Sequence, residues 1–542
     1  MKINKLSVIV CLIVPLYTTV RAEFAWESGY TTGYNQGRRI VYDPANNYLH
    51  VVINDGDEAY SWSPDGGATW LPNNTLHREY LPWLSFGTYG GAISIDPNGK
   101  PWITSVHPGG IENFCYTLQG GVKVGGEWHT GGLFGYPGTP PCTVGVMGYS
   151  VTAVSKYRDP DNLFTAYTLV PVHKYFYPYP NWPLEDTRLH ALYLIAWGID
   201  NHGCVIPYSV YEIDQVELTG QTLPYLQGSI AVQKDWNGDI IHLVWRGFEP
   251  LIGSKIYHNE TRAITPAQIR AGQRIQWQEQ RFPVSEDHEP ADYPSADFWD
   301  DSPVTPINDA QLIVVWHGPD PAGRFPGDVW KRIKKNDRWY GASCISQGAS
   351  PQPVESRYPQ ASTPNVVVWQ EEVNGGEIYG SFWGEIVPVV HRDGRDQFPQ
   401  IAVEPTGDLA VLHCHTLWTR ADEREIRYLR YDYVPRLNRE GGLGDGGVWI
   451  SENDLWLEVI SLFGHQTRLR YYLPSETRLE MTVYDLSGRV ITKLYAGKQG
   501  KGWHELIWNG TDQNGRTVGT GSYLWVLKTP RAVKVKPVRL MR

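Results

Sequence analysis

The chain has 542 residues, of which 13% are aromatic, with 55 Gly, 39 Pro and only 4 Met. Abundant glycine and proline with few long helical periods indicate an all-β protein with many turns and exclude a helical one. A formal net charge of −10 lacks the basic footprint of nucleic-acid binding, so no nucleic-acid partner is expected. The length exceeds one ordinary domain and accommodates a large domain plus a smaller one.

Residues 1–22 have the pattern of a secretory signal peptide. Lys2 and Lys5 precede an apolar run over 6–17, and Val20-Arg21-Ala22 places small residues at a cleavage site. We therefore expect a mature chain that starts near Glu23 and is secreted or displayed on the cell surface, with no membrane span after cleavage. The alternative is an N-terminal anchor, for which the apolar run is short.

A three-strand pattern recurs along residues 23–439. Its clearest copy contains Tyr358-Pro359-Gln360-Ala361, then Val366-Val367-Val368-Trp369-Gln370, then residues 377–382. Other copies begin near Ser229, Tyr293 and Phe398, and weaker ones near Arg39, Ala92 and Tyr149. Repeats that cannot bury their faces alone stack radially, and closing the ring removes exposed sheet edges. The seven copies predict a seven-bladed β-propeller, with six or eight blades left open.

One turn in the first copy has a recognisable motif. Ser63, Asp65, Gly67, Thr69 and Trp70 follow the order Ser-x-Asp-x-Gly-x-Thr-Trp. This octapeptide resembles the Asp-box, or bacterial neuraminidase repeat, of sialidase-type propellers. The resemblance implies a hairpin turn between the two outer strands of a blade, stabilised by the aspartate, with the tryptophan packed between blades. It marks the fold and carries no catalytic role.

Two long segments rich in glycine, proline and aromatics, 111–147 and 171–188, are predicted to be loops. Such loops either line a site or pack over the edge of the propeller. Cys115 and Cys142 could form a disulfide across the first of them in an oxidising compartment. No CxxC pair occurs, so a cysteine zinc site is not indicated, and we expect neither a metal nor a cofactor.

Propeller geometry predicts which residues meet at one mouth of the central channel. In each blade the first strand begins, the second ends and the third begins at the same end of the ring. The candidates at this mouth are Asn54, Asp55, His107, Arg246, His317, Gln370, Glu371, His413 and His415, together with Arg38, Arg39, Tyr293, Tyr358 and Asp396 at the starts of first strands. Polar strand ends that only meet water are the alternative explanation.

The residue types at this mouth suit an acidic sugar. His317, Tyr358 and Glu371 are the candidate catalytic residues, because His, Tyr and carboxyl groups transfer protons. Arg39, Arg246, His413 and His415 are candidate ligand-binding residues, because arginine forms bidentate contacts with carboxylates. Arg39-Ile40 is similar to the first Arg-Ile pair of sialidases, but a third arginine and a Tyr–Glu pair have no clear counterparts.

Two functions follow from this set. The first is binding of a glycan or protein ligand at the mouth. The second is a carbohydrate-active enzyme that acts on an acidic sugar, either a sialidase-like glycosidase with paired carboxylates or a polysaccharide lyase with His, Tyr and Arg.

A Gly-rich stretch at 440–454 separates a C-terminal segment, 455–542, with its own motifs. Their order is Tyr471-Tyr472-Leu473-Pro474, Val483-Tyr484-Asp485-Leu486-Ser487-Gly488, Trp503 to Gly510, Asp512-Gln513-Asn514-Gly515 and Gly519 to Tyr523. This segment resembles the Ig-like domain of the flagellar hook-capping (FlgD) family, which also terminates cargo of the type IX secretion system. The resemblance implies a small β-sandwich, a sorting tail at 534–542 and the secretion machinery as a partner.

Overall fold

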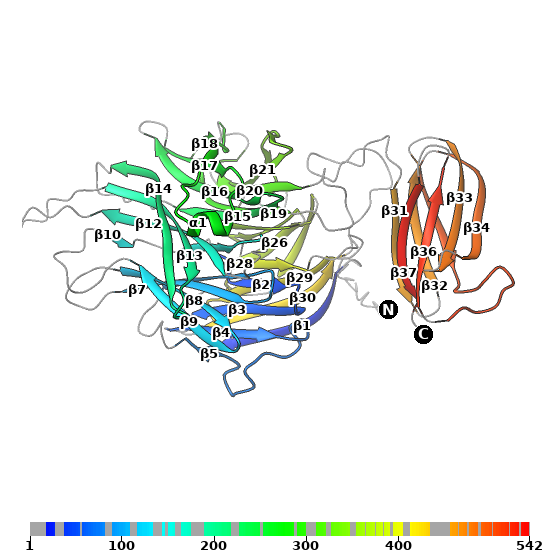
Figure 1. The fold of residues 1–542 in the computed structure, drawn as a ribbon, viewed down its shortest axis with the longest axis horizontal. Helices are drawn as coiled ribbons and strands as arrows, with labels where there is room; N and C mark the ends of the chain where they lie inside the picture. Colours follow the sequence, from blue (N-terminus) through cyan, green and yellow to red (C-terminus); the bar gives the residue numbers. More distant parts are fainter. Residues whose placement is uncertain are drawn as a thin grey trace, which may run out of the picture. The chain divides into compact units, whose positions relative to one another are not determined.

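The computed structural model divides into two compact units, with the main division after residue 436 (Figure 1). It describes residues 18–540 except 28–36, 55–56, 82–88, 109–115, 134–143, 147–149, 158–163, 175–188, 218–226, 250–252, 287–289, 300–309, 321–326, 347–353, 364, 374–375, 383, 391–393, 405–411, 434–455, 464–465, 474–475, 486–488, 501, 520 and 530–532. Cys115, Cys142 and the linker 440–454 lie outside the described residues, as does most of both long loops.

The described residues of the first unit form seven antiparallel sheets, which follow one another along the chain as blades. Blade 1 contains β2 (Ile40–Asp43), β3 (Tyr48–Asn54), β4 (Glu58–Ser63) and β5 (Glu79–Tyr80). Blade 2 contains β6 (Tyr89–Ile95), β7 (Pro101–Pro108), β8 (Tyr116–Val124) and β9 (Glu127–Leu133). Blade 3 contains β10 (Val144–Val146), β11 (Val151–Val154), β12 (Thr165–Lys174), β13 (Leu189–Ile199) and β14 (Val205–Glu217).

The next four blades repeat this arrangement. Blade 4 contains β15 (Gly228–Asp235), β16 (Gly238–Glu249), β17 (Gly253–Thr261) and β18 (Trp277–Pro283). Blade 5 contains β19 (Asp292–Trp299), β20 (Gln311–Gly318), β21 (Asp328–Lys335), β22 (Arg338–Trp339) and β23 (Ser343–Cys344). Blade 6 contains β24 (Ser356–Ser362), β25 (Val366–Glu371), β26 (Glu377–Phe382) and β27 (Glu385–Val390). Blade 7 contains β28 (Asp396–Val403), β29 (Leu412–Arg420), β30 (Glu425–Tyr433) and, as its outermost strand, β1 (Thr18–Glu27).

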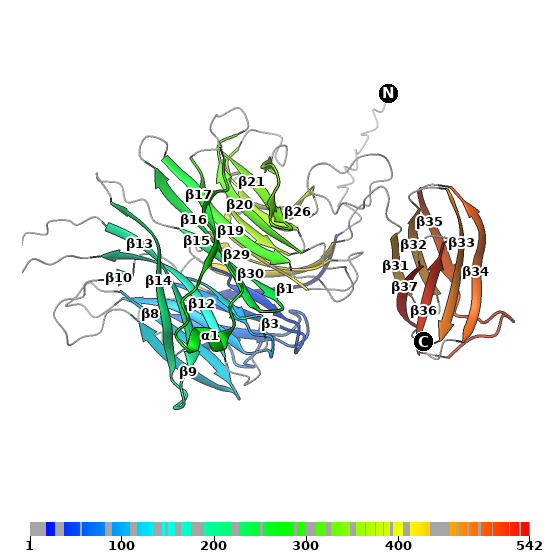
Figure 2. The same cartoon turned by 45° about the horizontal axis from the view of Figure 1, so that its top comes forward.

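The blades form a closed ring. Their innermost strands contact one another in the order β2, β6, β11, β15, β19, β24 and β28, and β28 contacts β2. The colours of Figures 1 and 2 follow this order, and both views show β1 beside β30. Closure of the ring by seven sheets confirms the predicted seven-bladed β-propeller.

The N-terminal strand closes the last blade through non-local pairing. Trp26 in β1 is the pairing partner of Ile426 in β30, and its side chain is buried. The expected signal cleavage after residue 22 would leave Glu23–Glu27 in this pairing. The described residues contain no helix long and apolar enough to cross a membrane.

The second strands are continuous apolar runs because neighbouring blades cover both of their faces. Val366, Val367, Val368 and Trp369 of β25 are all buried. Trp316 at the corresponding position of β20 is buried in a cluster that spans blades 4 and 5. The Val-Val-Trp pattern of the sequence is therefore the contact surface between blades.

The turn after β4 is held by its own side chains. The Thr69 amide donates to Asp65 Oδ1 (2.8 Å), and the Thr69 hydroxyl donates to Asp65 Oδ2 (2.7 Å). The Gly67 amide, at a φ of 91°, donates to the Ser63 hydroxyl. Trp70 is buried against Tyr428 of blade 7, with ring centroids 5.0 Å apart. The turn thus fixes the contact between blades 1 and 7.

The second unit is a β-sandwich. One sheet contains β31 (Trp456–Phe463), β32 (Gln466–Leu473) and β35 (Gly502–Trp508), and the other contains β34 (Val490–Gln499), β33 (Thr477–Asp485), β36 (Gly521–Lys528) and β37 (Val533–Leu540). Leu469, Met481, Trp508 and Trp525 are buried between the sheets. Residues 534–540 of the expected sorting tail belong to β37, which pairs with β36 as a strand of this sandwich.

Candidate ligand-binding site

A row of aromatic rings crosses three neighbouring blades at the predicted mouth. Tyr293, Tyr358 and Phe398 occupy the same position near the start of β19, β24 and β28. The ring centroids of Tyr293 and Tyr358 are 5.0 Å apart, and those of Tyr358 and Phe398 are 4.9 Å apart. The His317 ring extends the row beyond Tyr293, at 5.8 Å. Tyr293, Tyr358 and Phe398 are half-buried, so part of each ring faces solvent.

Three of the four rings of this mouth row are positioned by the same backbone distortion. Tyr293, Tyr358 and Phe398 have φ values of 57°, 55° and 54°, a region that bulky residues rarely adopt. Each precedes a proline and lies within an irregularity of the pairing register, where a strand redirects a side chain. The Tyr293 amide donates to Gln227 of blade 4, and the Phe398 amide donates to Gln370 of blade 6. Such strain is common at functional sites.

A polar group adjoins the row at His317. His317 Nε2 lies 3.4 Å from Glu355 Oε1, and Arg357 Nη2 lies 2.5 Å from Glu355 Oε2. The contacts with His317 and Arg357 lower the pKa of Glu355 to about 2, so this carboxylate is ionised at neutral pH. The Arg357 side chain is 36% exposed, which leaves donors available to a ligand.

Burial keeps both tyrosines of the row protonated. Burial and the neighbouring Tyr358 raise the pKa of Tyr293 to about 12. Burial also raises the pKa of Tyr358, although Arg357 acts in the opposite direction. At neutral pH the two hydroxyls are therefore hydrogen-bond donors and not phenolate bases.

Arg246 and His317 are connected through Asp292, the first by a side-chain contact and the second by strand pairing. Arg246 Nε contacts Asp292 Oδ1 at 2.5 Å, and Asp292 is the cross-strand partner of His317. The structure thus brings together these two predicted residues from blades 4 and 5. Because Asp292 offsets the charge of Arg246, this arginine stiffens the junction between blades beside the row.

The two N-terminal arginines have structural contacts. Arg38 reaches across the channel, with Nη2 2.8 Å from Asp297 Oδ1 of blade 5. Arg39 is 1% exposed, with Nη1 3.9 Å from Glu58 Oε2, and Asn54 donates to the same carboxylate. Arg39, a predicted ligand-binding residue, is therefore buried against a carboxylate of its own blade.

Three other predicted residues are held by contacts near their own strands. Glu371 is 1% exposed and accepts hydrogen bonds from Trp369 and Ser356 of its own blade. The expectation that His413 and His415 follow the end of a second strand is wrong, because β29 begins at Leu412 and ends at Arg420. His413 Nδ1 lies 2.8 Å from Asp432 Oδ1, and His415 is buried between Tyr428 and Glu404 at the opposite end of the blade.

The remaining mouth candidates divide into buried and undescribed residues. Asp396 accepts hydrogen bonds from Trp418 and Arg420 within blade 7 and is buried. Asp55 and the side chain of His107 lie outside the described residues. Glu355, Arg357 and Phe398 were not among the predicted site residues, although Phe398-Pro399 repeats the aromatic-proline pattern that marks Tyr293 and Tyr358.

Comparisons with known proteins support the two-unit organisation. The FlgD Ig-like domain family matches residues 459–531, within the sandwich. No curated protein matches the sequence. The crystal structure of polysaccharide lyase Uly1 is 11% identical, with a TM-score of 0.36, and the match covers 77% of this chain and 100% of that one.

Two further solved structures have comparable scores. The fucose-specific lectin from Aleuria aurantia is 12% identical, with a TM-score of 0.37 and coverage of 65% and 94% of the two chains. The Trypanosoma rangeli sialidase in complex with sialic acid is 10% identical, with a TM-score of 0.33 and coverage of 97% and 88%. At TM-scores this low the likenesses carry no argument about the site. The propeller itself rests on the closed ring of sheets.

Proposed function

We propose that this protein is a secreted or cell-surface propeller that binds a glycan at the mouth row. The observation that carries the proposal is the continuous row of rings formed by His317, Tyr293, Tyr358 and Phe398. Tyr293, Tyr358 and Phe398 occupy equivalent strand positions, and His317 adjoins Tyr293. The backbones of the first three residues have positive φ angles, which cost conformational energy. A blade core does not require that strain, so presentation of the rings is its best explanation.

The chemistry of the row suits a sugar chain. Aromatic faces bury the apolar C–H faces of sugar rings, while a few well-placed polar groups fix orientation. The Tyr293 and Tyr358 hydroxyls are donors to sugar hydroxyls. The partly exposed Arg357 guanidinium suits a carboxylate or sulfate on the sugar, because its planar donors pair with such oxyanions. An acidic glycan is therefore the favoured ligand, with a protein ligand as the alternative outcome of a binding screen.

The C-terminal unit supports delivery outside the cell. The FlgD Ig-like match covers most of the sandwich, and the sequence of residues 1–22 favours export. On this proposal the sandwich presents the chain to the secretion machinery and the propeller carries the binding site.

The binding proposal is tested with a glycan array that includes uronic-acid and sulfated glycans, followed by calorimetry on each hit. Tyr358→Ala and Tyr293→Ala should weaken binding about 30-fold each, or about 2 kcal/mol, as for a buried aromatic anchor. Trp236→Ala is the matched control, because this 86% exposed ring lies in the β15–β16 turn at the opposite end of the blade. Wild-type affinity in both tyrosine variants would refute the proposal.

A second candidate function, cleavage of the bound glycan, rests on His317. Its imidazole is 7% exposed, adjoins Tyr293 and lies beside an ionised glutamate, a setting that suits proton transfer. If the protein is a lyase or glycosidase, His317→Ala should lower turnover about 10²–10⁴-fold and leave affinity nearly unchanged. A reducing-sugar assay with acidic polysaccharides measures this. If His317→Ala and Tyr358→Ala lose affinity equally and the wild type shows no turnover, the catalytic function is contradicted and only the binding function remains.

A further inference from the structure

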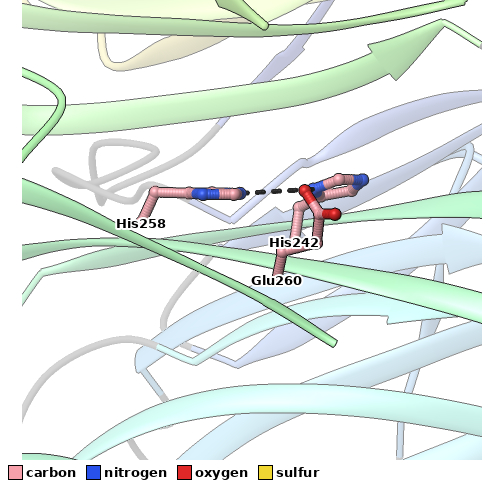
Figure 3. A group of neighbouring side chains, drawn as sticks. All are labelled: His242, His258 and Glu260. Atoms are coloured by element: carbon pink, nitrogen blue, oxygen red, sulfur yellow. Dashed lines mark hydrogen bonds and ion pairs between the residues drawn. The ribbon is translucent and has the colours of Figure 1, made fainter. Parts of the chain in front are cut away.

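Three buried side chains of blade 4 converge far from the mouth row. His242 lies on β16, and His258 and Glu260 lie on β17; they are 2%, 0% and 2% exposed. One nitrogen or oxygen of each lies within 4.8 Å of the others. Figure 3 shows the His258 ring directed toward His242, with the Glu260 carboxylate beside the same point.

The spacing of these atoms matches a shared ligand. His242 Nδ1 lies 3.2 Å from His258 Nε2 and 3.4 Å from Glu260 Oε2. A tetrahedral zinc ion with bonds of about 2.0–2.1 Å separates its ligand atoms by about 3.3–3.4 Å. Two of the three ligand pairs therefore already have the separation that such an ion imposes.

Outer partners direct both imidazole lone pairs toward this point. His258 Nδ1 lies 2.5 Å from Glu279 Oε2, and His242 Nε2 lies 3.2 Å from Gln233 Oε1. Each acceptor holds a proton on the outer nitrogen, so the inner nitrogens have only lone pairs to offer each other. Two facing lone pairs at 3.2 Å require a proton or a cation between them.

Blade 1 provides an internal comparison. There His50 of β3 is the cross-strand partner of Trp62, and Val52 is the partner of Tyr60. In blade 4 the same register pairs His242 with Glu260 and Val244 with His258. Tyr60 and Trp62 are thus replaced by His258 and Glu260, so two aromatic positions have become two metal-binding groups.

The surroundings of the two positions also correspond in part. In blade 1 a lysine of the next blade, Lys123, lies 2.7 Å from Glu79, and Trp128 donates to Glu79. In blade 4 a lysine of the next blade, Lys334, lies 3.4 Å from Glu279, and Trp339 donates to Glu279. The lysine, tryptophan and glutamate around the two positions therefore correspond, whereas Asp43 beside His50 is replaced by Gln233 beside His242.

The replacement also removes a proton donor. His50 Nδ1 lies 2.6 Å from the Tyr60 hydroxyl, a group that can donate its proton to this nitrogen. His258, with its own proton held toward Glu279, cannot replace that hydroxyl. Blade 4 thus offers ligands where blade 1 has a complete hydrogen bond.

We propose that His242, His258 and Glu260 bind a divalent transition metal, with zinc as the best fit to two imidazole nitrogens and one carboxylate oxygen. Lys334 also contacts Glu260, and the negative charges of Glu260 and Glu279 offset part of the positive charge of the metal and the lysine. Since the site joins β16, β17 and a side chain of blade 5, its role is to stabilise this blade junction.

The test is the metal content of the full chain produced in zinc-supplemented medium and measured by inductively coupled plasma mass spectrometry after gel filtration. The wild type should carry about one zinc per chain. A variant with both His258→Tyr and Glu260→Trp, which copies blade 1, should carry less than a tenth of that amount. The conservative Glu260→Gln variant should also lose zinc, and His415→Gln, another buried histidine beside a carboxylate, is the control that keeps it.

Thermal melting gives an independent readout. A chelator should lower the melting temperature of the wild type, added zinc chloride should restore it, and both blade 4 variants should respond to neither. A wild type that contains no zinc under these conditions would show that a proton on His242 joins the cluster and would overturn the proposal. Full zinc occupancy in the Glu260→Gln and double variants would overturn it as well.

Discussion

Glu371 and its neighbour Gln370 on β25 have different contacts, and only Gln370 reaches the mouth row. Gln370 holds the amide of Phe398 in the neighbouring blade, whereas Glu371, the next residue of β25, is enclosed by Trp369 and Ser356. Burial raises the pKa of Glu371 from 4.5 to about 7. A carboxyl shifted in this direction favours its protonated form in the folded chain, so it costs stability once it ionises.

We expect Glu371→Gln to remove part of the pH dependence of stability. The stability linked to the raised pKa is fully present below pH 4.5 and is lost as the pH rises through about 7. At pH 8 the variant should therefore be more stable than the wild type by about 3 kcal/mol, and at pH 4.5 the two should be nearly equal. Melting temperatures of both proteins across this range measure the effect. Parallel curves for the two proteins would contradict it.

The sequence located site residues where a strand end was unambiguous. His317 directly follows an apolar run that ends in Trp316, and Tyr358 marks the start of the first strand of the next blade. Both residues could therefore be placed at the mouth from the sequence. The apolar run 409–412 suggested a strand that ends at His413, whereas β29 begins there, so both histidines lie at the wrong end. Glu355 and Arg357 could not be selected, because their role depends on contact with His317 from another blade.

At the scale of the element, two local devices separate function from stability. The aromatic-proline bulges redirect three rings into the mouth, whereas the turn after β4 closes on itself and anchors Trp70 between blades. Ser63 at the end of β4 lies at the opposite end of the blade from the mouth row. A change in this turn should therefore affect folding alone.

Asp65→Ala tests this separation. It removes the acceptor for the Thr69 amide and hydroxyl and the partner of Ser63, which should lower the free energy of unfolding by about 1–3 kcal/mol. Asp65→Asn keeps one acceptor oxygen and should cost less. Glycan affinity should be unchanged in both variants. Thermal melting and calorimetry measure the two effects, and a binding defect in a fully folded Asp65→Ala protein would contradict the separation.

At the scale of the whole molecule, each unit has a core of its own. The propeller buries its second strands between blades, and the sandwich buries Trp508 and Trp525 between two sheets. The sequence predicted both architectures because the blade pattern and the sandwich turns are local signals. It could not predict that β1 completes blade 7, because pairing across the whole propeller leaves no local signature.

A chain that ends after Val448 should therefore fold. We expect its propeller to melt at the same temperature as in the full chain and to keep its glycan affinity, while surface display or release from the producing cell should fall. Circular dichroism, calorimetry and fractionation of cells test these three outcomes. An unfolded or aggregated truncation product would show that the propeller depends on the sandwich.

The pairing of β1 with β30 determines when the propeller can be completed during synthesis. Trp26 and Ile426 are 400 positions apart. Strand β1 therefore has no pairing partner until β30 has been synthesised. At about 5–20 residues per second, the ribosome needs roughly 20–80 s to make the intervening segment. During that interval blade 7, which carries Phe398, does not exist, and the row of rings has no third member. On the proposed function, the chain therefore completes its binding surface only after the last blade of the propeller has been synthesised.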